Sequence, residues 1–222
     1  MKKFAFTLAE TLIVMGIIGV VAALTLPNLN SSTGDKEKVV KLQKIYSNLQ
    51  DALGRAEAVY GPVNEWFIKD TTTAAKTKRF AERITEFMKI SKDCGSSTGC
   101  HSKSSKSLKG YTFNDCTGDS IYSIITADGT SICFKEVGVI FIDIDGQNKG
   151  ANTYGKDQFI FEYNDKFDNG NKIMPTGWDD NSWYTQECFE IGTACAQWVL
   201  QNQNMDYLKC PEKLSENVTS CK

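Results

Sequence analysis

A run of apolar residues from Phe6 to Pro27, interrupted by one carboxylate at Glu10, is the feature that most constrains the fold of this chain. A membrane-spanning helix needs about 20 predominantly apolar residues, and this run reaches that length. A charge inside hydrocarbon costs several kcal/mol, so a span that keeps one usually has a partner for it. We therefore expect a transmembrane helix over residues 6–27 and a specific partner for Glu10.

The residues before this run form a short basic leader that ends in a small residue. Lys2 and Lys3 precede Ala5, and residues 6–10 read FTLAE. This order resembles the N-terminal signature of type IV pilins and type II secretion pseudopilins. The resemblance implies that prepilin peptidase cleaves between Ala5 and Phe6 and that the new amine of Phe6 is methylated. Ala5 stands where most members of the family carry glycine.

The same resemblance assigns roles to three residues of the helix. Gly19 and Pro27 fall where many members carry a glycine and a proline that soften the helix in the filament. In a filament, Glu10 would pair with the Phe6 amine of a neighbouring subunit. Loss of one member of a buried ion pair typically costs about 3–5 kcal/mol, so this contact would also set the register between subunits.

The resemblance also implies a location and a set of partners. By the positive-inside tendency, Lys2 and Lys3 place the N-terminus in the cytoplasm. We expect a single pass through the inner membrane and a periplasmic head, which becomes periplasmic or extracellular in a filament. The implied partners are other copies or related pilin-like subunits, prepilin peptidase and the inner-membrane assembly platform.

An ordinary secretory signal peptide is the alternative interpretation of the N-terminus. Its apolar region would be residues 11–21, and cleavage after Ala23 would leave Leu24 as the first residue. Glu10 and the order of residues 6–10 argue against it. This alternative predicts a secreted, disulfide-rich binding module.

Residues 28–60 have the pattern of an amphipathic helix. Its apolar stripe is formed by Val39, Leu42, Tyr46, Leu49, Leu53, Ala56 and Tyr60. Gly61 and Pro62 end the pattern. The chain is therefore divided into a cleaved leader (1–5), a transmembrane or filament-core helix (6–27), an amphipathic half (28–60) and a globular head (61–222).

The head contains a helical pattern followed by strand patterns. We expect a helix over 73–91, an exposed loop over 92–110, and strands over 120–127, 130–135, 137–144 and 159–163. Asp128-Gly129 is a hairpin signal between the first two strands. The predicted fold class is α+β: a long N-terminal helix, half transmembrane and half amphipathic, packed on a disulfide-stapled antiparallel sheet.

Oxygen-bearing side chains gather in a glycine-rich segment after the third predicted strand. Asp143, Asp145, Asn148 and Asp157 are the ligand types that calcium prefers, and the segment resembles a loop seen in many pilin-like heads. The alternative, which we favour, is an Asx-type turn whose carboxylates accept hydrogen bonds from backbone N–H groups. The sequence requires no cofactor.

The even number of cysteines in an exported chain predicts disulfides. Eight cysteines allow 105 pairings, and short-range closure suggests Cys94–Cys100, Cys116–Cys133, Cys188–Cys195 and Cys210–Cys221. Crossing Cys188 or Cys195 with Cys210 is an open alternative. No pair has the Cys-x-x-Cys spacing of a zinc site.

Catalytic and nucleic-acid-binding patterns are missing from the sequence. His101 is the one histidine, and no nucleophile elbow or phosphate loop occurs. The formal charge of −2 gives no nucleic-acid footprint. We expect Trp198 to lie on a short helix that covers the sheet, and we favour core burial over glycan or partner binding for Trp178, Trp183 and Tyr184. These patterns argue against an enzyme, and the resemblance of the N-terminus implies a structural filament subunit, for which both a pilus subunit and a secretion pseudopilin fit.

Overall fold

The computed structural model describes residues 8–165, 172–177, 187–215 and 217–221, except for the side chains of Glu10 and of residues 22–33. Its elements are α1 (Leu8–Tyr60), η1 (Val63–Phe67), α2 (Thr73–Thr85), β1 (Ile90–Gly95), β2 (Ser105–Lys106), β3 (Thr112–Phe113), β4 (Ile121–Thr126), β5 (Ser131–Lys135), β6 (Val139–Asp143), β7 (Gln158–Tyr163), β8 (Ile173–Pro175), α4 (Cys195–Asn202), η2 (Asp206–Leu208) and η3 (Pro211–Lys213). The chain divides into two compact units, Met1–Glu37 and Lys38–Lys222. The second unit, which begins within α1, is called the head below.

The expected transmembrane half of α1 is not found. Among the described residues, no helix combines the length and the hydropathy needed to cross a membrane. This finding overturns both the transmembrane half of the predicted fold class and the expected single-pass location in the inner membrane. The fold is α+β with an antiparallel sheet and four disulfides.

The part of α1 that belongs to the head packs its apolar stripe into the main core. Val39, Leu42, Leu49, Leu53 and Ala56 are each at most 4% exposed. Their spacing of three, four and seven residues keeps them on one face, as the sequence pattern predicts. The helix ends at Tyr60 because the next residue is a glycine at φ 77°, a conformation that favours glycine, and a proline follows it.

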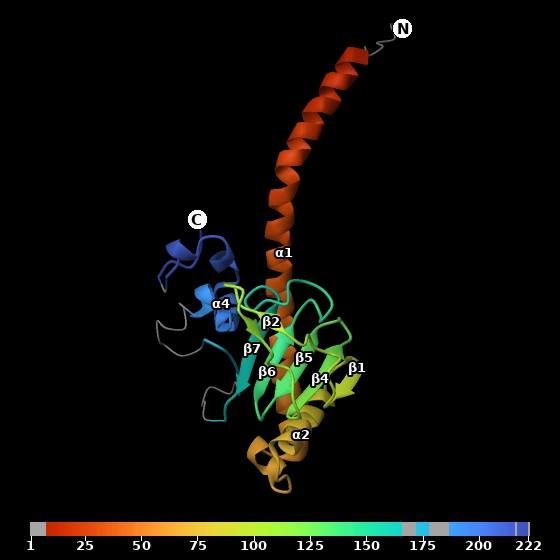
Figure 1. The fold of residues 1–222 in the computed structure, drawn as a ribbon, viewed down its shortest axis with the longest axis vertical. Helices are drawn as coiled ribbons and strands as arrows, with labels where there is room; N and C mark the ends of the chain where they lie inside the picture. The colour runs from red at the N-terminus through yellow and green to blue at the C-terminus, as the bar shows by residue number, and fades with distance from the viewer. Residues whose placement is uncertain (1–7, 166–171, 178–186, 216, 222) are drawn as a thin grey trace. The chain divides into compact units, whose positions relative to one another are not determined.

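The head is built on a six-stranded antiparallel sheet in the order β1-β4-β5-β6-β7-β8 (Figure 1). The four strands predicted from the sequence are confirmed as β4, β5, β6 and β7. The turn between β4 and β5 is also confirmed: Gly129 has φ 88°, and its N–H donates to the carbonyl of Thr126 at 3.0 Å. β2 and β3 form a separate two-stranded hairpin.

Residues alternate between the two faces of this sheet. On β5, Ile132 and Phe134 join the main core with α1, whereas Cys133 joins a second cluster on the other face. On β6, Ile140 and Ile142 belong to the main core and Phe141 to the second cluster. Both faces are therefore covered, and this explains why the central strands read as continuous apolar runs.

The predicted helix over 73–91 is wrong at its C-terminal end. α2 stops at Thr85, and Ile90 already pairs with Thr126 in the sheet. The pairing of β1 with β4 takes precedence over the helical pattern, since tertiary contacts override local propensity. The predicted exposed loop over 92–110 is likewise corrected, because it contains the end of β1, the strand β2 and the buried residues Cys100 and His101.

All four short-range disulfides are confirmed. Sulfur–sulfur bonds join Cys94–Cys100, Cys116–Cys133, Cys188–Cys195 and Cys210–Cys221. The bridged cysteines are separated by 6, 17, 7 and 11 residues. The crossed alternatives that involve Cys210 do not occur.

Candidate assembly surface and aspartate loops

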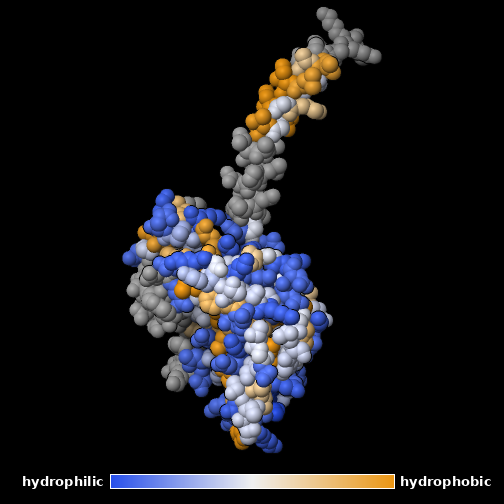
Figure 2. Space-filling view, in the orientation of Figure 1, coloured by the Kyte–Doolittle hydropathy of each residue, from blue (hydrophilic) through white to orange (hydrophobic). Residues whose placement is uncertain are grey.

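The N-terminal part of α1 exposes apolar side chains on every side of the helix. Between Leu8 and Val21 the large apolar residues are 54–79% exposed: Leu8, Leu12, Ile13, Val14, Met15, Ile17, Ile18, Val20 and Val21. At 100° per residue these positions surround the helix axis. Figure 2 shows this part of α1 as a nearly continuous hydrophobic surface. We call Leu8–Val21 the apolar segment.

The glycines of the apolar segment leave open space beside the backbone. A Cβ added at Gly16 or at Gly19 would meet no atom within 4 Å. The backbone is helical at Gly19 and at Pro27, and the softening expected at these two positions remains a prediction. Ala5, Phe6 and the side chain of Glu10 lie outside the described residues, so the processing site and the expected ion pair also remain predictions.

Asp157 organises the loop that precedes β7. Its carboxylate is completely buried: Oδ1 accepts a hydrogen bond from the Thr153 N–H at 2.6 Å, and Oδ2 accepts from the Asn152 N–H at 3.0 Å and from the Ala151 N–H. Gly150, at φ 70°, makes room for this carboxylate, because a Cβ at that position would collide with Oδ2. The backbone thus supplies the donors that a buried carboxylate requires.

Asp143 is the second fully buried carboxylate of this region. Its Oδ1 accepts from the N–H groups of Asp145 at 3.2 Å and Gly146 at 2.9 Å, and its Oδ2 accepts from the Gln158 side chain at 3.1 Å. Burial raises the pKa of Asp143 to about 6, and the charge of Asp157 adds to this, while the hydrogen bond from Gln158 opposes it. The Asx-type turn that we favoured from the sequence is therefore the arrangement at Asp143.

The four candidate calcium ligands do not share one coordination shell. Asp157 accepts from backbone N–H groups, Asp143 accepts from backbone N–H groups and from Gln158, and Asp145 forms ion pairs with Lys38 at 3.5 Å and Lys41 at 3.6 Å. Asn148 lies exposed on the intervening turn. In the part of the chain that the structure describes, no three His, Cys, Asp or Glu side chains are grouped so that they could hold a metal. Calcium binding by these residues would require most of these hydrogen bonds to break.

His101 is not the solvated loop residue that the sequence suggests. Its ring is 5% exposed and lies in a polar network with Ser102 and Gln158, whose Nε2 donates to Ser102 Oγ at 2.6 Å. Burial lowers the pKa of His101 to about 4, so the ring is neutral at pH 7. Its Nε2 has no hydrogen-bond partner among the described residues. Nothing in the sequence around His101 signals this burial, since the network joins its neighbour Ser102 to Gln158, which is distant in the sequence.

The C-terminal part of the head is held by aromatic packing, and Trp198 lies on a short helix, α4, as the sequence predicts. Trp198 is 8% exposed and contacts Phe189 edge to face, with ring centroids 5.0 Å apart. Phe189 in turn stacks against Tyr207. The other predicted aromatic positions, Trp178, Trp183 and Tyr184, lie outside the described residues.

Comparison with known proteins identifies one family for most of the chain. Residues 28–207 match the model of DUF6613, which is described as a family of unknown function. Comparison with curated proteins and with solved structures found no match. The family match begins inside α1 and extends through α4 to Tyr207, so it includes nearly the whole head. The chain therefore belongs to the DUF6613 family of proteins of unknown function.

Proposed function

We propose that this chain is a structural subunit of a helical filament of the type IV pilus or type II secretion kind. The observation that carries the proposal is the apolar segment, Leu8–Val21, whose large side chains are exposed all around the helix. A helix that is apolar on every face is stable only when it is buried. Each of its large apolar side chains contributes about 1.5–3 kcal/mol when it is fully buried.

Other copies of the same chain are the proposed cover for this segment. Equivalent segments from neighbouring subunits present matching apolar surfaces, and Gly16 and Gly19 let helices approach closely where no Cβ intervenes. The folded head, which includes Lys38–Tyr60 of α1, would be the part that the filament displays. The proposal retains prepilin peptidase as a processing partner, Ala5 and Phe6 as its cleavage site, and Glu10 as the partner of a neighbouring Phe6 amine.

A pair of matched substitutions tests the assembly surface. Ile17 and Val40 lie on the same helix and are 60% and 62% exposed, but only Ile17 belongs to the apolar segment. We expect Ile17→Lys to abolish filaments in electron micrographs of cells producing the chain, and to abolish sedimentable oligomers. Val40→Lys should leave both unchanged. Filaments that persist in Ile17→Lys would contradict the proposal.

The second candidate function is a secreted, disulfide-rich binding module, which the four disulfides favour. The mass of the mature N-terminal peptide separates the two candidates. A chain that begins with methylated Phe6 supports the filament subunit. A chain that begins at Leu24, having lost the whole apolar segment, supports the secreted module.

A further inference from the structure

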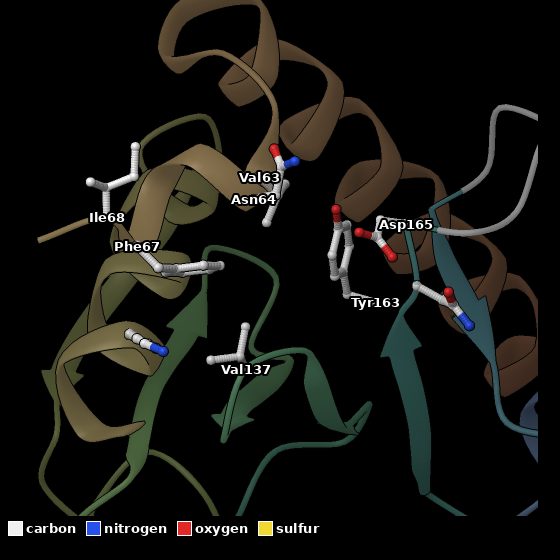
Figure 3. Close-up of a pocket in the computed structure, with 9 residues that line it drawn as sticks. Val63, Asn64, Phe67, Ile68, Val137, Tyr163 and Asp165 are labelled. Carbon is white, nitrogen blue, oxygen red and sulfur yellow. The ribbon is translucent and has the colours of Figure 1, made fainter. Parts of the chain in front are cut away.

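A pocket of about 540 Å³ opens in the head between η1, α2 and the end of β7 (Figure 3). Its volume lies within the range of small-ligand sites, about 300–1,000 Å³. The side chains that give it its chemistry come from four separate parts of the chain: Asn64, Phe67, Lys76, Val137, Tyr163 and Asp165. All belong to the head, so the site is independent of the apolar segment and of the proposed filament.

One side of this pocket is apolar and exposed. Figure 3 shows Phe67 pointing from η1 towards the middle of the pocket, close to Val137. Ile68, the next residue, is 81% exposed, and Val137 is 37% exposed. Single exposed apolar residues are ordinary, but here two of them, Ile68 and Val137, line one hollow together with the partly buried ring of Phe67.

The opposite side presents hydrogen-bonding groups. Tyr163 and Asp165 lie together there, and Asn64 of η1 also lines the pocket (Figure 3). Burial and the charges of Glu57 and Asp165 raise the pKa of Tyr163 to about 12, so its hydroxyl keeps its proton and can donate. Within the described part of the chain, neither Lys76 nor Asp165 forms an ion pair within 4 Å.

This combination discriminates between classes of ligand. A purely apolar molecule would remove Asp165 and Lys76 from water without replacing their hydrogen bonds, which is unfavourable. A simple anion would face the Asp165 carboxylate, and a simple cation would face the Lys76 ammonium. A neutral ring that carries several hydroxyl groups can form hydrogen bonds with both the Asp165 carboxylate and the Lys76 ammonium, because each hydroxyl can donate and accept. Its C–H face can pack on Phe67 in the same pose.

We propose that this pocket binds one sugar ring of a neutral carbohydrate. Phe67 supplies the surface on which the ring packs. Asp165 accepts from one of its hydroxyls, while Tyr163, Asn64 and Lys76 donate to others. The head would thus recognise a glycan end or a single exposed sugar residue.

The test is saturation-transfer NMR of the full chain with four probes: the methyl glycosides of glucose, mannose, galactose and N-acetylglucosamine. We expect at least one probe to bind with a dissociation constant in the millimolar range, about 1–10 mM. Asp165→Ala, at an exposed position, should weaken that binding about tenfold or more, and Phe67→Ala should do the same. Tyr111→Ala is the matched control, because Tyr111 is an aromatic residue that is 64% exposed and does not line the pocket.

Three outcomes would overturn the proposal. The first is that no probe binds at concentrations up to about 50 mM. The second is that a probe binds but Asp165→Ala and Tyr111→Ala affect it equally, which would place the site elsewhere. The third is that free leucine or indole binds where the glycosides do not, which would assign the pocket to a zwitterion or to an apolar ligand. Since Phe67 is partly buried against the core, Asp165→Ala keeps the test decisive if Phe67→Ala does not fold.

Discussion

Replacing Asp157 by asparagine should destabilise the head far more than the loss of one surface charge would. The Asp157 carboxylate is completely buried and is the shared acceptor for the N–H groups of Ala151, Asn152 and Thr153. Asparagine keeps one of the two oxygens. In its best orientation that oxygen stays near Ala151 and Asn152, and the new amide N–H₂ group faces the N–H of Thr153.

The size of the effect follows from these contacts. Hydrogen bonds to a charged group contribute about 1.5–3 kcal/mol each, and a buried donor left without a partner costs about 1–3 kcal/mol. Asp157→Asn removes the hydrogen bond from the Thr153 N–H and places the new amide N–H₂ group against that N–H, so that two donors face each other. It also weakens the hydrogen bonds from Ala151 and Asn152, because the accepting oxygen no longer carries a charge. We therefore expect a loss of about 3–4 kcal/mol in the free energy of unfolding. Asp157→Ala should cost more, because all three donors lose their acceptor.

Urea unfolding followed by circular dichroism, with the disulfides intact, measures this loss. Asp119→Asn is the matched control, since Asp119 is exposed and its substitution should change the free energy by no more than about 0.5 kcal/mol. A second variant, Gly150→Ala, perturbs the same carboxylate by placing a Cβ against Oδ2. Its effect should be less than additive with that of Asp157→Asn. Equal, small losses for Asp157→Asn and Asp119→Asn would refute the reasoning.

Three further predictions concern the core, a disulfide and pH. Leu49→Ala, at a completely buried position of α1, should lower the free energy of unfolding by about 2–5 kcal/mol, whereas Val40→Ala, at an exposed position, should leave it within about 0.5 kcal/mol in the same urea experiment. Replacing both Cys116 and Cys133 by alanine opens a loop of 17 residues and should cost about 3 kcal/mol. The folded pKa of His101, about 4, is below its usual value of 6.5, so His101 destabilises the fold progressively as pH falls from about 6.5 to 4. His101→Gln should reduce the pH dependence of the thermal midpoint in that window, and an unchanged pH profile would show that the ring is not buried as described.

Short sequence patterns predicted the strands of the sheet well, because the residues that form each pattern also form the contacts that stabilise the sheet. Ile132, Cys133 and Phe134 alternate between two covered faces, and Asp128-Gly129 supplies the turn that fixes the register of β4 and β5. The cysteine pairing followed from short separations alone. These features depend on neighbours in the sequence, so a pattern of a few residues contains the information.

Features that depend on distant partners were missed. The end of α2 at Thr85 is decided by the pairing of Ile90 with Thr126, which the helical pattern does not contain. His101 is buried, and its neighbour Ser102 accepts a hydrogen bond from Gln158 of β7, 56 residues further along the chain. The pocket joins Phe67 to Tyr163, residues from η1 and β7 that no short motif connects. The aspartate loop was predicted only in part. Its composition suggested either calcium binding or an Asx-type turn, and the hydrogen bonds to the backbone favour the turn.

The local pairing of all the cysteines has a mechanical consequence. α1 contains no cysteine, and each disulfide closes a loop within the region after Lys92. A pulling force applied to α1 would therefore meet no covalent crosslink to the sheet. It would be resisted by the packing of the α1 stripe and by side-chain contacts such as the ion pair of Glu57 with Lys172 at 2.7 Å. Under tension, α1 would separate from the sheet while every disulfide loop stayed closed. It would pack against the sheet again when the force was removed.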